Sequence, residues 1–62
     1  MFKENDIVHE TKSHWVGKVG VGHYEVLESK ATHSVRVATF HFSSKPDYAL
    51  SRAIAHCDRL SA

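Results

Sequence analysis

The sequence has little of what usually stabilises a very small protein. Its 62 residues include one cysteine, Cys57, and one proline, Pro46. A lone cysteine excludes an internal disulfide, and the absence of a Cys-x-x-Cys pair excludes the usual thiolate zinc site. No apolar run approaches the ~20 residues that cross a bilayer, and no signal peptide is visible. We therefore expect one soluble domain, 1–62, in a reducing, cytoplasmic setting.

Neither positive nor negative charge predominates in the sequence. Eight basic and seven acidic side chains give a net charge of +1, and the basic residues are spread along the chain without a run. Proteins that bind nucleic acid by neutralising phosphates usually concentrate their cations. The balance favours a protein partner over nucleic acid and gives no indication of a membrane partner.

The middle of the chain is rich in valine and aromatic residues, which is typical of strands. We predict a three-stranded antiparallel meander over roughly 14–19, 24–28 and 33–42. Four-residue loops at 20–23 and 29–32 would connect the strands. Residues 6–10 could add a short N-terminal edge strand, and residues 1–5 are expected to be loosely held.

Loops of this length fix a register. Tyr24 would pair with Val19 and Val37, while Val26 would pair with Gly17 and Val35. These pairs place the Val35 and Val37 side of the third strand inward. The opposite face would carry a row of alternating charge, namely Lys18, Glu25 and Arg36.

The C-terminal third predicts one helix. Ser44 is a good N-cap, Pro46 suits the first turn, and the helix would end near Leu60. An apolar stripe at helical spacing contains Leu50, Ala53, Ile54, Cys57 and Leu60. This stripe would cover the inward sheet face, with Gly17 allowing a close approach. The predicted fold is α+β, in the order βββα.

One helix covers only one face of such a sheet, so the other face is the predicted interaction surface. Phe40 and Phe42 lie on it, unless a bulge rotates the strand end. The full predicted surface is Val16, Lys18, Glu25, Leu27, Arg36, Ala38, Phe40 and Phe42. Exposed aromatics in so small a domain favour a homodimer or another macromolecular partner. The alternative is that the N-terminal segment, with Phe2, Ile7 and Val8, folds over them.

A second helical stripe is polar to basic. It contains Tyr48, Arg52, His56 and Arg59, at spacings of four, four and three residues. Such a stripe is either a solvated face or a contact for an acidic partner.

Catalytic and metal-binding patterns are absent. There are six histidines, but His33 and His41 are eight residues apart on one strand, too far to share an ion. Cys57 lies on the apolar stripe, where cysteine is usually an inert small hydrophobe. The stretch "GKVGVGH" lies between strands and is typical of a hairpin rather than a phosphate-binding loop. We expect no enzyme activity, no metal and no cofactor.

Two resemblances bear on function. The segments "THSVRVATF" and "ALSRAIAHCDRL" resemble small accessory proteins of bacterial phages and plasmids, which implies a bacterial cytoplasm and brings no known activity. "RVATF" followed by an alanine-rich helix is similar to AP2 and integrase N-terminal DNA-binding domains, which implies duplex reading by Lys18 and Arg36. Glu25 on the same face and a longer connection before the helix depart from that pattern. The sequence thus favours a non-enzymatic interaction protein, with a DNA-binding module as the alternative.

Overall fold

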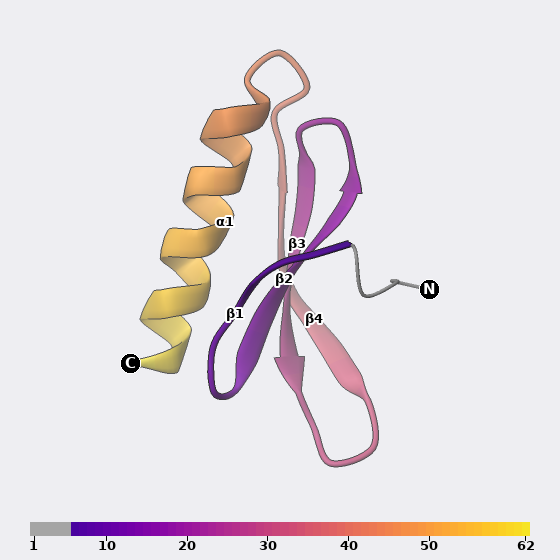
Figure 1. The fold of residues 1–62 in the computed structure, drawn as a ribbon, viewed down its shortest axis with the longest axis vertical. Helices are drawn as coiled ribbons and strands as arrows, with labels where there is room; N and C mark the ends of the chain where they lie inside the picture. Colours follow the sequence, from indigo (N-terminus) through magenta and orange to yellow (C-terminus); the bar gives the residue numbers. More distant parts are fainter. Residues whose placement is uncertain (1–5) are drawn as a thin grey trace.

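A computed structural model describes residues 6–62 as an antiparallel sheet with one helix along one of its faces (Figure 1). The four strands lie in the order β1-β2-β3-β4, so every neighbour in the sheet is also a neighbour in sequence. The elements are β1 (Ile7–Glu10), β2 (His14–Gly20), β3 (His23–Ser29), β4 (Ser34–His41) and α1 (Pro46–Ser61). The predicted α+β fold is confirmed, and the optional N-terminal edge strand is present as β1.

The β2–β3 hairpin is tighter than predicted. Gly20 pairs with His23, so only Val21 and Gly22 lie between the paired residues. Gly22 has a φ of +66°, and its carbonyl accepts a hydrogen bond of 2.8 Å from the Phe42 N–H. A Cβ at Gly22 would lie 2.5 Å from the Phe42 carbonyl oxygen. Glycine is therefore required here both by the left-handed backbone and by the chain that follows β4.

A bulge at Val19, between the paired residues Lys18 and Gly20, moves the rest of β2 by one residue relative to β3. Val16 pairs with Val26, and Lys18 pairs with Tyr24. Because strand side chains alternate, a shift of one residue exchanges the two faces of a strand. Val16 is thus fully buried beneath the helix, and Lys18 points to the helix side, where it is exposed. Gly17 pairs with Glu25 and faces away from the helix, so it does not bring the helix close as predicted.

A bulge rotates the end of β4. Val26 pairs with Ala38 while the next residue, Leu27, pairs with Arg36, so Val37 has no partner of its own. Beyond the bulge Phe40 pairs with Tyr24 and shares its face. The prediction that Ala38 and Phe40 lie on the open face is therefore wrong, and the alternative of a bulge is the one observed.

The valines expected inward are not in the core. Val35 and Val37 are 40% and 44% exposed. Val35 pairs with Glu28 and so lies on the helix side as predicted, but it remains outside the core, and Val37 is the bulge residue that has no partner. The β3–β4 loop does have four residues, which lie between the paired Ser29 and Ser34, and within it the Lys30 N–H donates to the His33 carbonyl at 2.7 Å.

The core lies between β2, β3 and α1. Val16, Tyr24 and Val26 meet three small helical residues, Ala49, Ala53 and Cys57. All three of these helical residues are completely buried, and their small side chains let the helix axis approach the sheet. The predicted stripe is rotated in consequence: Ala53 and Cys57 are central, Leu50 and Ile54 are half-buried, and Leu60 is 41% exposed.

The helix begins one residue later than its predicted cap implies. Lys45, not Ser44, is the N-cap, and it makes no side-chain capping bond. Pro46 occupies the first turn, where its missing N–H costs nothing, and Asp47 lies near the positive end of the helix dipole. Among the described residues no helix is long and apolar enough to cross a membrane.

Gly22 provides a test of the hairpin. Gly22→Ala should lower the free energy of unfolding by about 1–3 kcal/mol, because alanine is strained at positive φ and its Cβ meets backbone. Gly20→Ala is the matched control, since nothing lies within 4 Å of a Cβ there. Urea denaturation followed by circular dichroism measures both. Equal effects of the two changes would contradict the observed turn.

Candidate interaction surfaces

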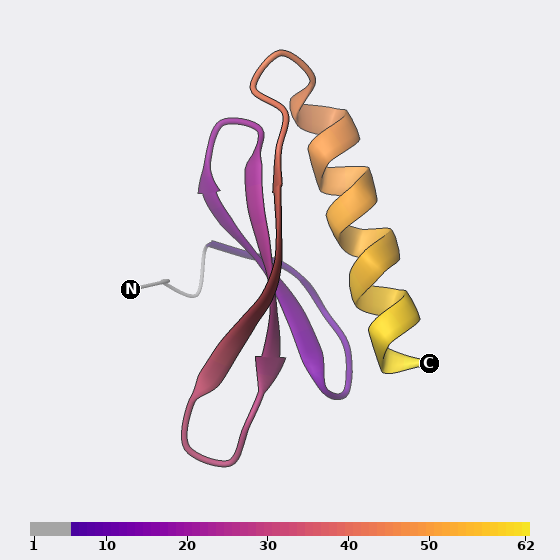
Figure 2. The same ribbon diagram turned by 180° about the vertical axis from the view of Figure 1, so that it is seen from behind.

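The sheet face opposite α1, called the open face below, is covered by no helix or strand within residues 6–62 (Figures 1 and 2). Side chains alternate between the two faces along each strand, and residues that pair across neighbouring strands lie on the same face. The observed pairs therefore identify the residues of the open face. Its side chains from β2, β3 and β4 include Trp15, His23, Glu25, Leu27, Ser34, Arg36, Thr39 and His41. Three cross-strand contacts follow one another along this face.

The first contact is made by Trp15. Its indole Nε1 donates to the Ser34 Oγ at 3.0 Å. Because β2 and β4 lie on opposite sides of β3, this bond requires the indole to lie across β3. Leu27 is directly opposite Trp15 in the ladder and is only 7% exposed. Trp15 and Leu27 therefore form an apolar contact on the open face, which no helix covers.

The second contact is the ion pair of Glu25 and Arg36. Arg36 Nη1 lies 3.1 Å from Glu25 Oε2, and the two side chains are 63% and 14% exposed. Lys18 does not join them, because it points to the helix side. The predicted plus–minus–plus row therefore does not form, and the charge of Arg36 is balanced by its neighbour.

The third contact is a pair of histidines that the sequence reasoning missed. His23 and His41 are direct partners in the β3–β4 ladder. Their rings stack with centroids 4.5 Å apart and an interplanar angle of 16°. A correct register would have found this pair, whereas spacing along one strand could only compare His41 with His33.

The predicted interaction surface is divided between the two faces. Glu25, Leu27 and Arg36 lie on the open face as predicted. Val16, Ala38 and Phe40 belong to the core or pack against it. Phe42 is 39% exposed but packs edge-to-face on Tyr48 of the helix, with ring centroids 5.1 Å apart. The pair of exposed aromatics expected to drive self-association is thus engaged by α1.

The second helical stripe is only partly a solvated face. The Tyr48 ring contacts Phe42 and lies beneath the Arg52 guanidinium, whose carbon is 5.9 Å from the ring centroid. His56 packs edge-on against Phe40, with centroids 5.6 Å apart. Arg52 and Arg59 remain exposed. Half of the stripe therefore holds the end of β4 on the helix.

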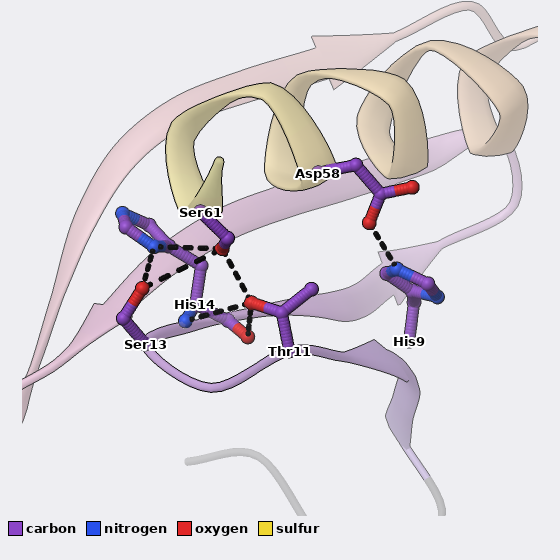
Figure 3. Close-up of polar contacts among 6 residues, drawn as sticks. All are labelled: His9, Thr11, Ser13, His14, Asp58 and Ser61. Atoms are coloured by element: carbon purple, nitrogen blue, oxygen red, sulfur yellow. Dashed lines mark hydrogen bonds and ion pairs between the residues drawn. The ribbon is translucent and has the colours of Figure 1, made fainter.

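A polar cluster ties the other end of the helix to the sheet (Figure 3). Ser61 Oγ contacts Thr11 Oγ1 and lies 3.2 Å from the Nδ1 of His14, a buried residue. Ser13 Oγ lies 2.8 Å from the same nitrogen. One turn earlier, His9 Nε2 lies 2.8 Å from Asp58 Oδ1. These contacts fix the last helical turn over the β1–β2 connection.

The two edges of the sheet differ in their protection. Edge strands in monomers are usually short, bulged or charged. β1 has four residues, contains an irregularity between Ile7 and His9, and ends in Glu10. β4 also contains a bulge, at Val37, but it has eight residues and one charged side chain, Arg36, which is already paired with Glu25. β4 is therefore the less protected edge, with Val35 and Val37 half-exposed along it.

Cys57 is unsuited to nucleophilic catalysis. It is completely buried, and this burial raises the pKa of its thiol. A hydrogen bond with Thr11 opposes the rise, and the carboxylate of Asp58 adds to it. His56, the adjacent residue, packs on Phe40 instead. Within residues 6–62 no group of three or more His, Cys, Asp or Glu side chains could hold a metal ion.

Comparison with known proteins found no match: no protein family, no curated protein and no solved structure is significantly similar to this chain.

The state of Cys57 can be measured directly. Alkylation by iodoacetamide near pH 8 should be about 100-fold slower in the native protein than in urea, because the thiol reacts only after opening. The raised pKa means that the unfolded chain loses this proton first. The free energy of unfolding should therefore fall as the pH rises above the ordinary thiol pKa of 9.0. Cys57→Ala should remove this part of the decline, and an unchanged pH profile would contradict it.

Proposed function

We propose that this chain is a non-enzymatic interaction protein that self-associates through the β4 edge and presents its open face to a macromolecular partner. The observation that carries the proposal is the unequal protection of the two sheet edges. A second copy is the natural occupant of β4, since antiparallel pairing of two β4 strands about a two-fold axis extends one sheet across both molecules.

Charge supports pairing between identical copies. The single cation of β4 is balanced by Glu25, and the chain as a whole has a net charge of +1. Two copies therefore meet without strong repulsion. The half-exposed side chains of Val35 and Val37 would lose exposure in such a pair.

The small size of the chain also supports self-association. A domain of this length rarely obtains more than about 3–5 kcal/mol from its own core, and self-association is one of the few remaining sources of stability. The chain has no disulfide to add, because Cys57 is its one cysteine. Burial of further apolar surface between copies would supply the difference.

The character of the open face favours a protein partner. Its side chains include the Trp15 indole, an Arg–Glu pair and two imidazoles, and aromatic residues and arginine are enriched where proteins bind proteins. Among the described strand residues of this face, Arg36 is the one Lys or Arg, and Glu10 and Glu25 share the face with it. This arrangement weighs against the DNA-binding alternative.

Self-association can be tested at the β4 edge. Sedimentation at about 100 μM should give twice the 7.0 kDa chain mass. Val37→Lys should leave a folded monomer, because Val37 is half-exposed and lysine protects an edge strand. Val8→Lys is the matched control on the opposite edge, at 39% exposure, and should remain dimeric. A wild-type monomer at this concentration, or a dimer that survives Val37→Lys, would refute β4 pairing.

Binding to duplex DNA separates the two readings of the open face. We expect no affinity tighter than micromolar at about 150 mM salt, because one cation per chain neutralises few phosphates. Any residual binding by a dimer should weaken with a log–log salt slope no steeper than roughly −2. Fluorescence anisotropy with a labelled duplex measures both quantities. Nanomolar affinity that is lost in Arg36→Ala would favour the DNA-binding module instead.

A further inference from the structure

The stacked histidines at the end of the open face have features of a ligand site. His23 lies at the start of β3 and His41 at the end of β4, directly across the ladder beside the β2–β3 hairpin. His41 is exposed and His23 is half-buried, so the pair is open to solvent on one side. Their backbone positions are fixed by the sheet, and only the ring torsions need to move.

The ring nitrogens of this pair have no side-chain partner among residues 6–62. His9 contacts Asp58, His14 contacts two serines and His33 contacts Thr32. Within residues 6–62, the side chains of His23 and His41 contact each other and form no hydrogen bond or ion pair with another side chain. Imidazoles with free nitrogens, held side by side, are the usual donors for zinc, nickel and copper ions.

The spacing suits a shared ion. With Zn–N distances of about 2.0–2.1 Å and a tetrahedral angle, two nitrogens on one zinc ion lie about 3.3 Å apart. The observed rings are stacked nearly parallel, with centroids 4.5 Å apart, so their in-plane nitrogen lone pairs do not yet converge, and both rings must rotate out of the stack to point one nitrogen each at a shared ion. Rotation about the terminal imidazole torsion is soft, and the exposed ring of His41 has room for it.

We propose that His23 and His41 form a two-histidine chelate for a divalent transition-metal ion of the zinc, nickel and copper class. Water fills the remaining coordination positions, since no third protein donor converges among the described residues. Two ligands make an exchangeable site rather than a structural one, which agrees with a domain that already has a core. The bound ion would join β3 to β4 and leave positions open to a donor from another molecule.

Isothermal titration calorimetry with zinc chloride tests the site. Wild-type protein should bind one zinc ion per chain with a dissociation constant in the micromolar range, and magnesium, which prefers oxygen ligands, should not bind. His41→Gln should weaken zinc binding at least tenfold without unfolding, because its side chain is exposed. His23→Gln should do the same. His33→Gln, in the β3–β4 turn, is the matched control and should bind zinc as the wild type does.

A second measurement distinguishes chelation from general histidine binding. On zinc addition the imidazole nitrogen resonances of His23 and His41 should shift together, with those of His9 and His14 unchanged. Val37→Lys should bind zinc normally, because the site does not depend on β4 pairing. Absence of binding below about 1 mM zinc, or binding that survives loss of both histidines, would overturn the proposal.

Discussion

The arrangement of this small domain depends on one unpaired residue, Val37. The bulge at this position changes the pairing of β4 between Arg36 and Ala38, so the two halves of the strand keep different registers with β3. Without it, Phe40 would lie on the open face, and neither its contact with His56 nor the stack of His23 on His41 could form. The core and the open face both depend on this extra residue.

Local signals in the sequence were sufficient for the elements but not for their register. Valine-rich runs and an alanine-rich amphipathic stretch predicted three strands and the helix, and both termini of the helix fell within two residues of expectation. The predicted faces of β2 and of the end of β4 were wrong because each strand contains a bulge, and composition does not reveal where a bulge lies. The two-residue turn at Val21 and Gly22 keeps the predicted offset of β2 and β3, but the bulge at Val19 shifts the rest of β2 by one residue, which exposes Lys18 on the helix side and buries Val16.

The predictions for the interaction surface also succeeded where local pattern was enough and failed where the register was needed. Glu25 and Leu27 were placed correctly because β3 is central, and its two faces are distinguished by its own alternation of polar and apolar residues. Assignments on β2 and β4 depended on pairing across a hairpin and were mostly lost. Trp15 was not proposed as a surface residue at all, because its role arises from reaching over β3 to Ser34, two strands away. No pattern within one segment encodes such a contact.

The position of the Trp15 indole across β3 makes its fluorescence an internal reporter of the open face. Trp15 is the one tryptophan in the chain, and its indole lies on the surface where a partner would dock. Its emission depends on the environment over β3, next to Leu27 and the Ser34 hydroxyl. Docking on the open face and separation of β4 from the sheet change that environment in different ways, the first by excluding water and the second by releasing the indole. The unlabelled protein therefore carries its own spectroscopic signal for events on this face.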